Sequence, residues 1–164
     1  MIIIVEGIDR VGKTTLCNML QKHTNFPIYK HNSYRFDYSK MDNLNETDKM
    51  LQLLDLYSIL NGNVIFDRFH WSDCVYGIID RGYNFNIAFD NEAKIDKKLR
   101  ELDAIIIYVL PTDIEASSLE HGKDLAEHKI MMDTCFVLSK IKKYKCTYLS
   151  LEETVKEVIY ECGL

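Results

Sequence analysis

The stretch IIIVEGIDRVGKTT, residues 2 to 15, is the part of the sequence that best indicates the fold class. Its first four residues are apolar and β-branched, which is typical of a buried parallel strand. The next segment, GIDRVGKT at residues 7 to 14, matches the pattern GxxxxGK[ST], and a helical pattern opens at Thr14. A strand, a glycine-rich turn and a helix N-terminus in this order form the context in which that pattern binds phosphate.

The residue types of this P-loop suit a triphosphate and a divalent cation. Two glycines let the backbone turn its N–H groups toward a phosphate, and the lysine neutralises the β and γ oxygens. The threonine after the lysine offers a hydroxyl to Mg²⁺. We therefore predict that ATP is the phosphoryl donor. The residues expected to contact it are Gly7, Asp9, Arg10, Val11, Gly12, Lys13, Thr14 and Thr15.

Asp9 and Arg10 place an acid and a base inside the loop, beside the bound phosphates. We interpret Arg10 as a catalytic cation supplied in cis, which stabilises charge on the phosphoryl group in transfer. The alternative is an exposed Asp-Arg pair with little effect.

A second charged motif, Asp67-Arg68-Phe69, follows the apolar run at 64–66. Charges at the carboxyl end of a buried strand lie where open α/β sheets bind ligands. We expect Arg68 to grip a phosphate through two hydrogen bonds, and Asp67 to organise Mg²⁺ or to orient the acceptor. The alternative is a salt bridge at the strand end.

Strand and helix patterns alternate along the chain, which predicts an α/β fold with a parallel, doubly wound sheet. Strands are expected at 2–5, 64–66, 104–110 and 146–149, with a weaker one at 27–30. Helices are expected at 14–23, 46–61, 72–80, 89–101, 113–119, 124–143 and 152–162. The lysine-rich run at 140–145 is interpreted as a solvated helix end, favoured by the helix dipole.

Length and composition indicate one domain over residues 1–164, with a formal net charge of −5. So acidic a chain argues against nucleic acid as a partner. No apolar run approaches the roughly 18 residues of a membrane span, and no secretory signal is expected. The five cysteines are scattered and never form a CxxC pair, so neither disulfides nor a zinc knuckle is indicated. We expect a cytoplasmic protein without a membrane partner.

The segments EGIDRVGKTT, residues 6–15, and FDRF, residues 66–69, followed by Ser72, resemble thymidylate kinase and the wider nucleoside monophosphate kinase group. The resemblance implies a P-loop kinase fold, a three-layer sandwich in which helices flank a central parallel sheet. It also implies that Arg68 contacts the monophosphate of an acceptor nucleotide and that Asp67 belongs to the catalytic centre. A homodimer is a further implication.

The same resemblance assigns Ser72 and Tyr76 to the pocket for the acceptor base. Both residues share one helical face with Ile79, so a core position for Tyr76 remains open. The presumed lid, about 117–124, contains no arginine, which makes Arg10 the leading candidate for the transition-state cation.

The chain departs from the family between Lys13 and Asp67, where it is shorter than typical thymidylate kinases. This puts the identity of the base in doubt. Arg35 and Phe36 follow the weak second strand, about where the family keeps an acceptor-site arginine and aromatic. A second phosphate clamp and a stacking surface are one interpretation, and a loop without such roles is the other.

We therefore expect a kinase that transfers the γ-phosphoryl group of Mg·ATP to a deoxynucleoside monophosphate, with dTMP or a related deoxypyrimidine nucleotide as the leading acceptor. Lys13, Arg10 and Asp67 would be catalytic, Thr14 and Asp67 would hold Mg²⁺, and Asp9 would contact the acceptor sugar. Two alternatives stay open. One is a kinase for a hydroxyl of a deoxynucleoside or of a modified base in DNA, and the other is a non-catalytic nucleotide-binding module.

Overall fold

Five parallel strands form a central sheet in the order β2-β3-β1-β4-β5 in the described part of the chain. The computed structural model describes residues 1–30, 43–121 and 124–164, and for 43–45 and 119–121 the backbone alone. The strands are β1 (Ile2–Glu6), β2 (Ile28–Lys30), β3 (Val64–Asp67), β4 (Ile105–Leu110) and β5 (Lys142–Thr147).

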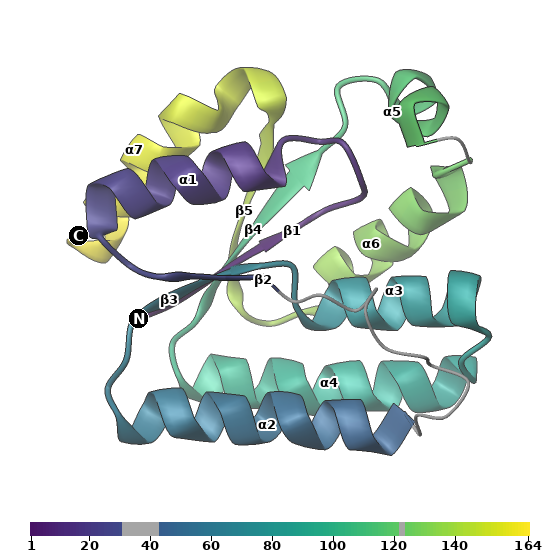
Figure 1. Cartoon of the computed structure of the whole chain (residues 1–164), viewed down its shortest axis with the longest axis horizontal. Coiled ribbons are helices and arrows are strands. Elements are labelled where there is room, and N and C mark those ends of the chain that lie inside the picture. The colour runs from purple at the N-terminus through teal and green to yellow at the C-terminus, as the bar shows by residue number, and fades with distance from the viewer. Residues whose placement is uncertain (31–42, 122–123) are drawn as a thin grey trace.

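Helices cover both faces of this sheet (Figure 1). On one face α1 (Lys13–Thr24) packs against α7 (Leu151–Cys162), and on the other α3 (His70–Arg81) packs against α4 (Phe85–Glu101) and α6 (Ala126–Leu138). α2 (Asn43–Ile59) lies against α4, and α5 (Ile114–His121) follows β4. The predicted three-layer α/β sandwich, with helices on both faces of a central parallel sheet, is confirmed.

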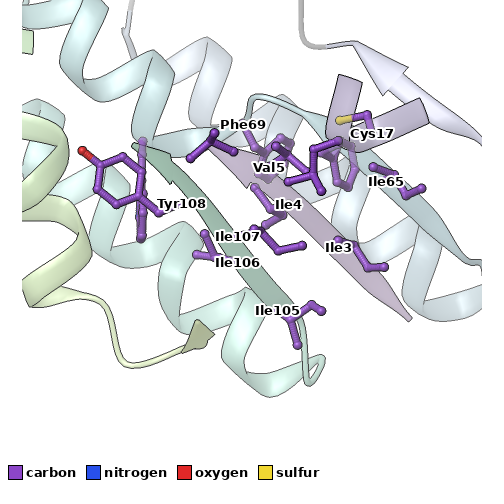
Figure 2. Packing of buried hydrophobic residues seen from close by; sticks show 14 of the residues in the cluster. Ile3, Ile4, Val5, Cys17, Ile65, Phe69, Ile105, Ile106, Ile107 and Tyr108 are labelled. Atoms are coloured by element: carbon purple, nitrogen blue, oxygen red, sulfur yellow. The ribbon is translucent and has the colours of Figure 1, made fainter. Parts of the chain in front are cut away.

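The core forms around β1 and β4, whose side chains are buried from both faces. Ile3, Ile4 and Val5 pair in register with residues of β3 and β4 and are fully buried, as is Ile106 (Figure 2). A parallel strand between two helical layers needs apolar residues at every position, which is why these runs do not alternate. Burial on both faces fixes the carboxyl end of β1, where the glycine-rich loop begins.

One part of the predicted element pattern is wrong. The helix expected at 124–143 ends at Leu138, and β5 spans 142–147 instead of the expected 146–149. β5 pairs with β4 alone, as an edge strand, so only Tyr144 and Cys146 need to be buried. Lysines are typical of edge strands, because their charge discourages pairing with another chain. The lysine run is therefore an edge strand and not a solvated helix end.

Several helices begin earlier than expected, α3 and α4 among them. α4 starts at Phe85, where the Asn84 side chain caps it by accepting a hydrogen bond from the Ile87 amide at 3.2 Å. α3 starts at His70, directly after the Asp67-Arg68-Phe69 turn. Among the described residues, no helix combines the length and the apolar character that crossing a membrane requires.

Candidate functional site

A cavity of about 310 Å³ opens at the carboxyl ends of β1 and β3. These two strands are neighbours in the sheet, so the loops that follow them meet there. The cavity brings together most of the predicted site residues and adds Lys30, which pairs in register with Asp67. Its lining consists of Asp9, Arg10, Val11, Gly12, Lys13, Thr14, Thr15, Lys30, Asp67 and Arg68.

Glycine at position 7 is required by the backbone of the loop and by its surroundings. Gly7 has φ of +148°, and a Cβ added there would lie 2.5 Å from the carbonyl oxygen of Val109 on β4. Such an approach to backbone cannot be relieved by a side-chain movement. Gly12, with φ of +94°, then caps α1 in the left-handed region and turns the chain into the helix. The first turn of α1 thus directs its free N–H groups toward the cavity.

Lys13 is the first residue of α1, and its ammonium group is buried under the loop. Its Nζ donates a hydrogen bond to the carbonyl oxygen of Ile8. Burial lowers the pKa of Lys13 to about 8, and the carboxylates of Asp67 and Glu6 act in the opposite direction. Negative charge from a phosphate group in the loop would raise this pKa again.

Thr14 and Asp67 join the two loops at the floor of the cavity. The Thr14 hydroxyl donates a hydrogen bond of 2.9 Å to Oδ2 of Asp67. Two adjacent ligands of an octahedral Mg²⁺, each at about 2.0 to 2.1 Å, are also about 2.9 Å apart. The hydroxyl and the carboxylate thus have the chemistry and the spacing of neighbouring Mg²⁺ ligands, and we consider that the two residues fit the ion.

Arg68 is held between the two loops. Its Nη2 donates to the carboxylate of Asp9 as an ion pair, and its guanidinium lies 5.2 Å from the ring centroid of Tyr76. The Tyr76 hydroxyl in turn accepts a hydrogen bond of 3.1 Å from the Asp9 amide. Nη1 of Arg68 is buried and makes no hydrogen bond with any described residue. One half of the guanidinium fork is therefore anchored, and the other half carries a donor without a partner among the described residues.

The backbone at Arg68 is unusual for a residue with a side chain. Its φ is +71°, and its amide donates a hydrogen bond of 3.0 Å to the carbonyl oxygen of Val5 on β1. This left-handed conformation turns the chain sharply between β3 and α3 and aims the guanidinium into the cavity.

Arg10 has a different environment. It is exposed at the edge of the cavity, with φ of +65°, and its guanidinium makes no hydrogen bond or ion pair with the part of the chain that the structure describes. Asp9, its neighbour, is paired with Arg68. An exposed cation on a short loop can approach the phosphates without breaking an existing contact.

Two of the predicted acceptor-site residues have interior positions. Ser72 is buried and donates a hydrogen bond of 2.5 Å to Glu6, and Tyr76 is buried with its ring against that of His128. Neither lines the cavity, although Tyr76 contacts both residues of the Asp9–Arg68 pair.

Arg35 and Phe36 lie outside the described residues. Of the presumed lid at 117–124, the structure places Ser117 and Ser118 on α5, and the side chains of 119–123 also lie outside the described part of the chain.

Glu6 is a positioning residue that sequence reasoning missed. It is fully buried, and its Oε1 accepts hydrogen bonds from the amides of Phe69, Trp71 and Ser72 at 2.9, 3.1 and 3.3 Å. These amides begin α3, so the carboxylate of β1 fixes the start of this helix and the turn that carries Arg68. The signal in the sequence was an acid that ends an apolar strand, directly before the first glycine of the loop.

The fold is shared with solved nucleotide-binding proteins. The YorR protein of Bacillus subtilis, in complex with phosphorylated GDP, superposes with a TM-score of 0.78 at 24% identity, over 100% of this chain and 96% of that one. The thymidylate kinase of Ehrlichia chaffeensis has a TM-score of 0.61 at 16% identity, over 99% of this chain and 98% of that one. The deoxyadenosine kinase of M. mycoides with bound dATP has a TM-score of 0.59 at 17% identity and full coverage of both chains.

At these identities the likeness establishes the fold alone, an α/β fold that this chain shares with a thymidylate kinase and a deoxyadenosine kinase. No family model and no curated protein matches the sequence.

Proposed function

We propose that this protein is a nucleoside monophosphate kinase, which transfers the γ-phosphoryl group of Mg·ATP to a deoxynucleoside monophosphate. The leading acceptor is dTMP or a related deoxypyrimidine nucleotide. The observation that supports this proposal is the shared cavity, in which a P-loop and a half-free arginine face each other. A site that only hydrolysed or sensed a triphosphate would have no need of a second anion clamp.

In the donor half of the cavity, the amides that begin α1 and the ammonium of Lys13 bind the β and γ oxygens. Thr14 and Asp67 would hold Mg²⁺, which shields the charge of the donor phosphates when it is bound. Lys13 exchanges the carbonyl oxygen of Ile8 for a phosphate oxygen, a stronger acceptor for a charged donor.

In the acceptor half, Arg68 would bind the monophosphate through Nη1 while Asp9 keeps the guanidinium in place. Asp9 would also contact the acceptor sugar. Lys30, at the end of β2, adds a second positive charge to this side of the cavity. The donor and acceptor phosphate groups would thus be held on either side of a short gap. The positive charges of Lys13, Lys30 and Arg68 would offset the repulsion between them.

Catalysis in this proposal rests on positioning and electrostatics, because phosphoryl transfer needs no covalent nucleophile from the protein. The acceptor phosphate oxygen attacks the γ-phosphorus, the bond to the β–γ bridging oxygen breaks, and ADP leaves with that electron pair. Arg10 is the cation that can move to the transferring group as charge shifts.

A second candidate is a kinase that phosphorylates a hydroxyl group on a deoxynucleoside. It is favoured by the match in fold to a deoxyadenosine kinase. In this case Asp67 would accept the proton of the hydroxyl, but its Oδ2 already accepts a hydrogen bond from Thr14. This contact, together with the free half of Arg68, makes the monophosphate the preferred acceptor.

The test is to incubate the protein with Mg·ATP and each nucleoside, each nucleoside monophosphate and a short DNA in turn, and to follow ADP release. Turnover that depends on a monophosphate and is lost in Lys13→Ala supports the proposal. Turnover with a nucleoside or with DNA alone would contradict the role of Arg68, and ATP binding without any turnover would favour a nucleotide-sensing module.

Arg68→Ala separates acceptor binding from donor binding. Loss of a charged hydrogen-bond partner is expected to weaken acceptor binding by about 1.5 to 3 kcal/mol, which is about 10-fold to 150-fold in KM. Donor KM should change little.

The matched control is Arg81→Ala. The Arg81 side chain is 13% exposed against 16% for Arg68, it pairs with Asp73 at 2.9 Å, and its guanidinium lies 5.4 Å from the ring centroid of Tyr83, away from the cavity. If Arg81→Ala raises acceptor KM as much as Arg68→Ala does, the assignment of Arg68 is wrong.

A further inference from the structure

Three side chains with metal-binding atoms meet between α3 and α4, apart from the nucleotide cavity. His70 is the first residue of α3, and Glu92 and Asp96 lie one turn apart on α4. The Nε2 atom of His70 is 3.8 Å from Oε1 of Glu92 and 3.6 Å from Oδ1 of Asp96, and one ligand atom from each residue lies within 4.8 Å of the others. None of the three lines the cavity of the P-loop.

These side chains are buried, but the atoms that face one another have no hydrogen-bond partner. The side chains of His70, Glu92 and Asp96 are 0%, 5% and 11% exposed. Both ring nitrogens of His70, Oε1 of Glu92 and Oδ1 of Asp96 make no hydrogen bond with the described residues. Buried polar atoms are almost always paired, and an unpaired one costs about 1 to 3 kcal/mol. Several such atoms at one point indicate that a further group belongs between them.

The chemistry of the three ligands identifies that group as a cation. As metal ligands, an imidazole and two carboxylates would together carry two negative charges, which a divalent ion would neutralise at this largely buried position. Burial raises the pKa of Glu92, and the neighbouring carboxylate of Asp96 acts in the same direction, against the effect of His70. One nitrogen and two oxygens suit a transition-metal ion such as Zn²⁺ better than Mg²⁺ or Ca²⁺, which prefer oxygen alone.

The geometry also fits a four-coordinate ion. Zinc ligands at about 2.0 to 2.2 Å from the metal lie about 3.4 Å apart in a tetrahedron, close to the observed 3.6 and 3.8 Å. A small cavity of about 10 Å³, lined by His70 and Glu92 among others, adjoins the cluster and has room for one water molecule as a fourth ligand. Oδ2 of Asp96 accepts a hydrogen bond of 3.3 Å from the Lys140 amide, which keeps Oδ1 directed at the other two ligands.

We propose that His70, Glu92 and Asp96 bind one divalent transition-metal ion, with Zn²⁺ as the best fit, and that this ion joins α3 to α4. The site is structural, because the ligands are buried and separate from the nucleotide cavity. It would anchor the N-terminus of α3, two residues after Arg68. This inference does not depend on the proposed kinase activity.

The experiment is to strip the protein of metal with a chelator and to titrate Zn²⁺ by calorimetry with excess Mg²⁺ present, so that Mg²⁺ occupies the P-loop site. One Zn²⁺ per chain is expected, together with a rise in Tm. Glu92→Gln keeps the shape of the side chain and all five cysteines, and we expect it to weaken Zn²⁺ binding by at least about 100-fold and to abolish the rise in Tm.

The matched control is Asp80→Asn. Asp80 belongs to another His–carboxylate pair, in which Nε2 of the buried His128 lies at hydrogen-bond distance, 3.1 Å, from Oδ1 of the partly exposed Asp80. This variant should bind Zn²⁺ like the unchanged protein. Without Zn²⁺, Glu92→Gln is expected to be as stable as the unchanged protein or more so, because it removes one of two facing carboxylates.

Three results would overturn the proposal. The first is that the unchanged protein does not bind Zn²⁺, and the second is that Glu92→Gln binds Zn²⁺ as tightly as the unchanged protein does. The third is that Glu92→Gln is less stable than the unchanged protein whether or not Zn²⁺ is present, which would indicate that the three side chains form a hydrogen-bond network instead of a metal site. If Glu92→Gln does not fold, Asp96→Asn provides the same comparison. The metal content of the protein purified from zinc-supplemented cells gives an independent measurement on the unchanged chain, and less than about a tenth of an equivalent would also contradict the site.

Discussion

Arg10 and Arg68 line the same cavity, but their surroundings differ and lead us to expect different roles. Arg68 is anchored by Asp9 and by the ring of Tyr76, so its position is fixed before a ligand arrives. Arg10 is exposed and has no such anchor among the described residues. A fixed arginine suits binding of a ground-state phosphate, and an unanchored one suits a contact made only as charge develops in the transition state.

Arg10→Ala is therefore expected to lower kcat by about 10³-fold or more, the scale of an arginine finger, while both KM values change little. Steady-state kinetics with saturating Mg·ATP and acceptor measure this effect. Arg10→Lys is the matched variant, since it keeps the charge but loses the planar fork, and we expect an intermediate kcat. An unchanged kcat in Arg10→Ala would remove the residue from catalysis.

Lys13 makes nucleotide binding depend on pH in a defined window. Its pKa is lowered to about 8 by burial in the nucleotide-free protein, and bound phosphates raise it again. Binding should therefore take up about half a proton near pH 8 and close to one near pH 9, but almost none near pH 6.5. Calorimetry of Mg·ATP binding in buffers with different ionisation enthalpies measures the number of protons.

The control for this prediction is Lys13→Arg, whose guanidinium stays protonated at every pH of the experiment. It should bind Mg·ATP, more weakly, without proton uptake at pH 8 to 9. If both proteins take up the same number of protons, another group is responsible and the lowered pKa of Lys13 is wrong.

At the same scale, the sequence was sufficient to single out those cavity residues that lie close together in the chain. Lys13 and Thr14 follow from the loop pattern, and Asp67 and Arg68 from a charged pair at a strand end. Glu6 could not be predicted as a positioning residue, because its partners are the amides of a helix that begins 63 residues or more later. The meeting of His70 with two carboxylates of α4 was missed for the same reason: it depends on how two helices pack.

At the scale of elements, the buried strands were predictable and the edge strand was not. β1 as far as Val5, and β4 along its length, are apolar because both faces are covered, so a short run suffices to identify them. β5 is half covered, and its lysines find partners that no local pattern reveals. Lys142 pairs with Glu161 at 2.8 Å, and the ammonium of Lys145 lies 4.2 Å from the ring centroid of Phe136. The end of α6 and the start of β5 are therefore set by tertiary contacts.

The junction between β1 and α1 yields a prediction on stability. Gly7→Ala forces a side chain into a left-handed conformation and against a β4 carbonyl, so we expect the free energy of unfolding to fall by about 3 kcal/mol or more. Gly82→Ala is the matched control, because Gly82 also has positive φ, +71°, but open space at its Cβ position. It should lose only about 1 to 2 kcal/mol.

Urea unfolding at equilibrium measures both losses, and titration with Mg·ATP should show that Gly7→Ala alone no longer binds nucleotide. Equal losses of stability in the two variants would mean that the approach to Val109 has no effect and that only the backbone conformation matters.

At the scale of the whole molecule, the site depends on the order of strands in the sheet. β1 lies between β3 and β4, so the loop after β1 meets the turn after β3 even though some 60 residues separate them in the chain (Figure 1). The contacts between Thr14 and Asp67 and between Asp9 and Arg68 exist only when the sheet is formed. Binding at the cavity is therefore linked to the folding of the entire domain.

This linkage predicts how ligands change Tm. Mg·ATP at 100 times its Kd adds about 2.7 kcal/mol of stability, which corresponds to a rise in Tm of about 5 to 10 °C for a domain of this size. The acceptor monophosphate alone should also raise Tm. In Arg68→Ala the acceptor monophosphate should no longer raise Tm, whereas Mg·ATP should still do so. Lys13→Ala should lose the shift with Mg·ATP, and Arg81→Ala should keep both. Scanning calorimetry at fixed multiples of Kd measures each shift. If Mg·ATP binds but leaves Tm unchanged, binding at the P-loop is not linked to the unfolding of the sheet, and this prediction is wrong.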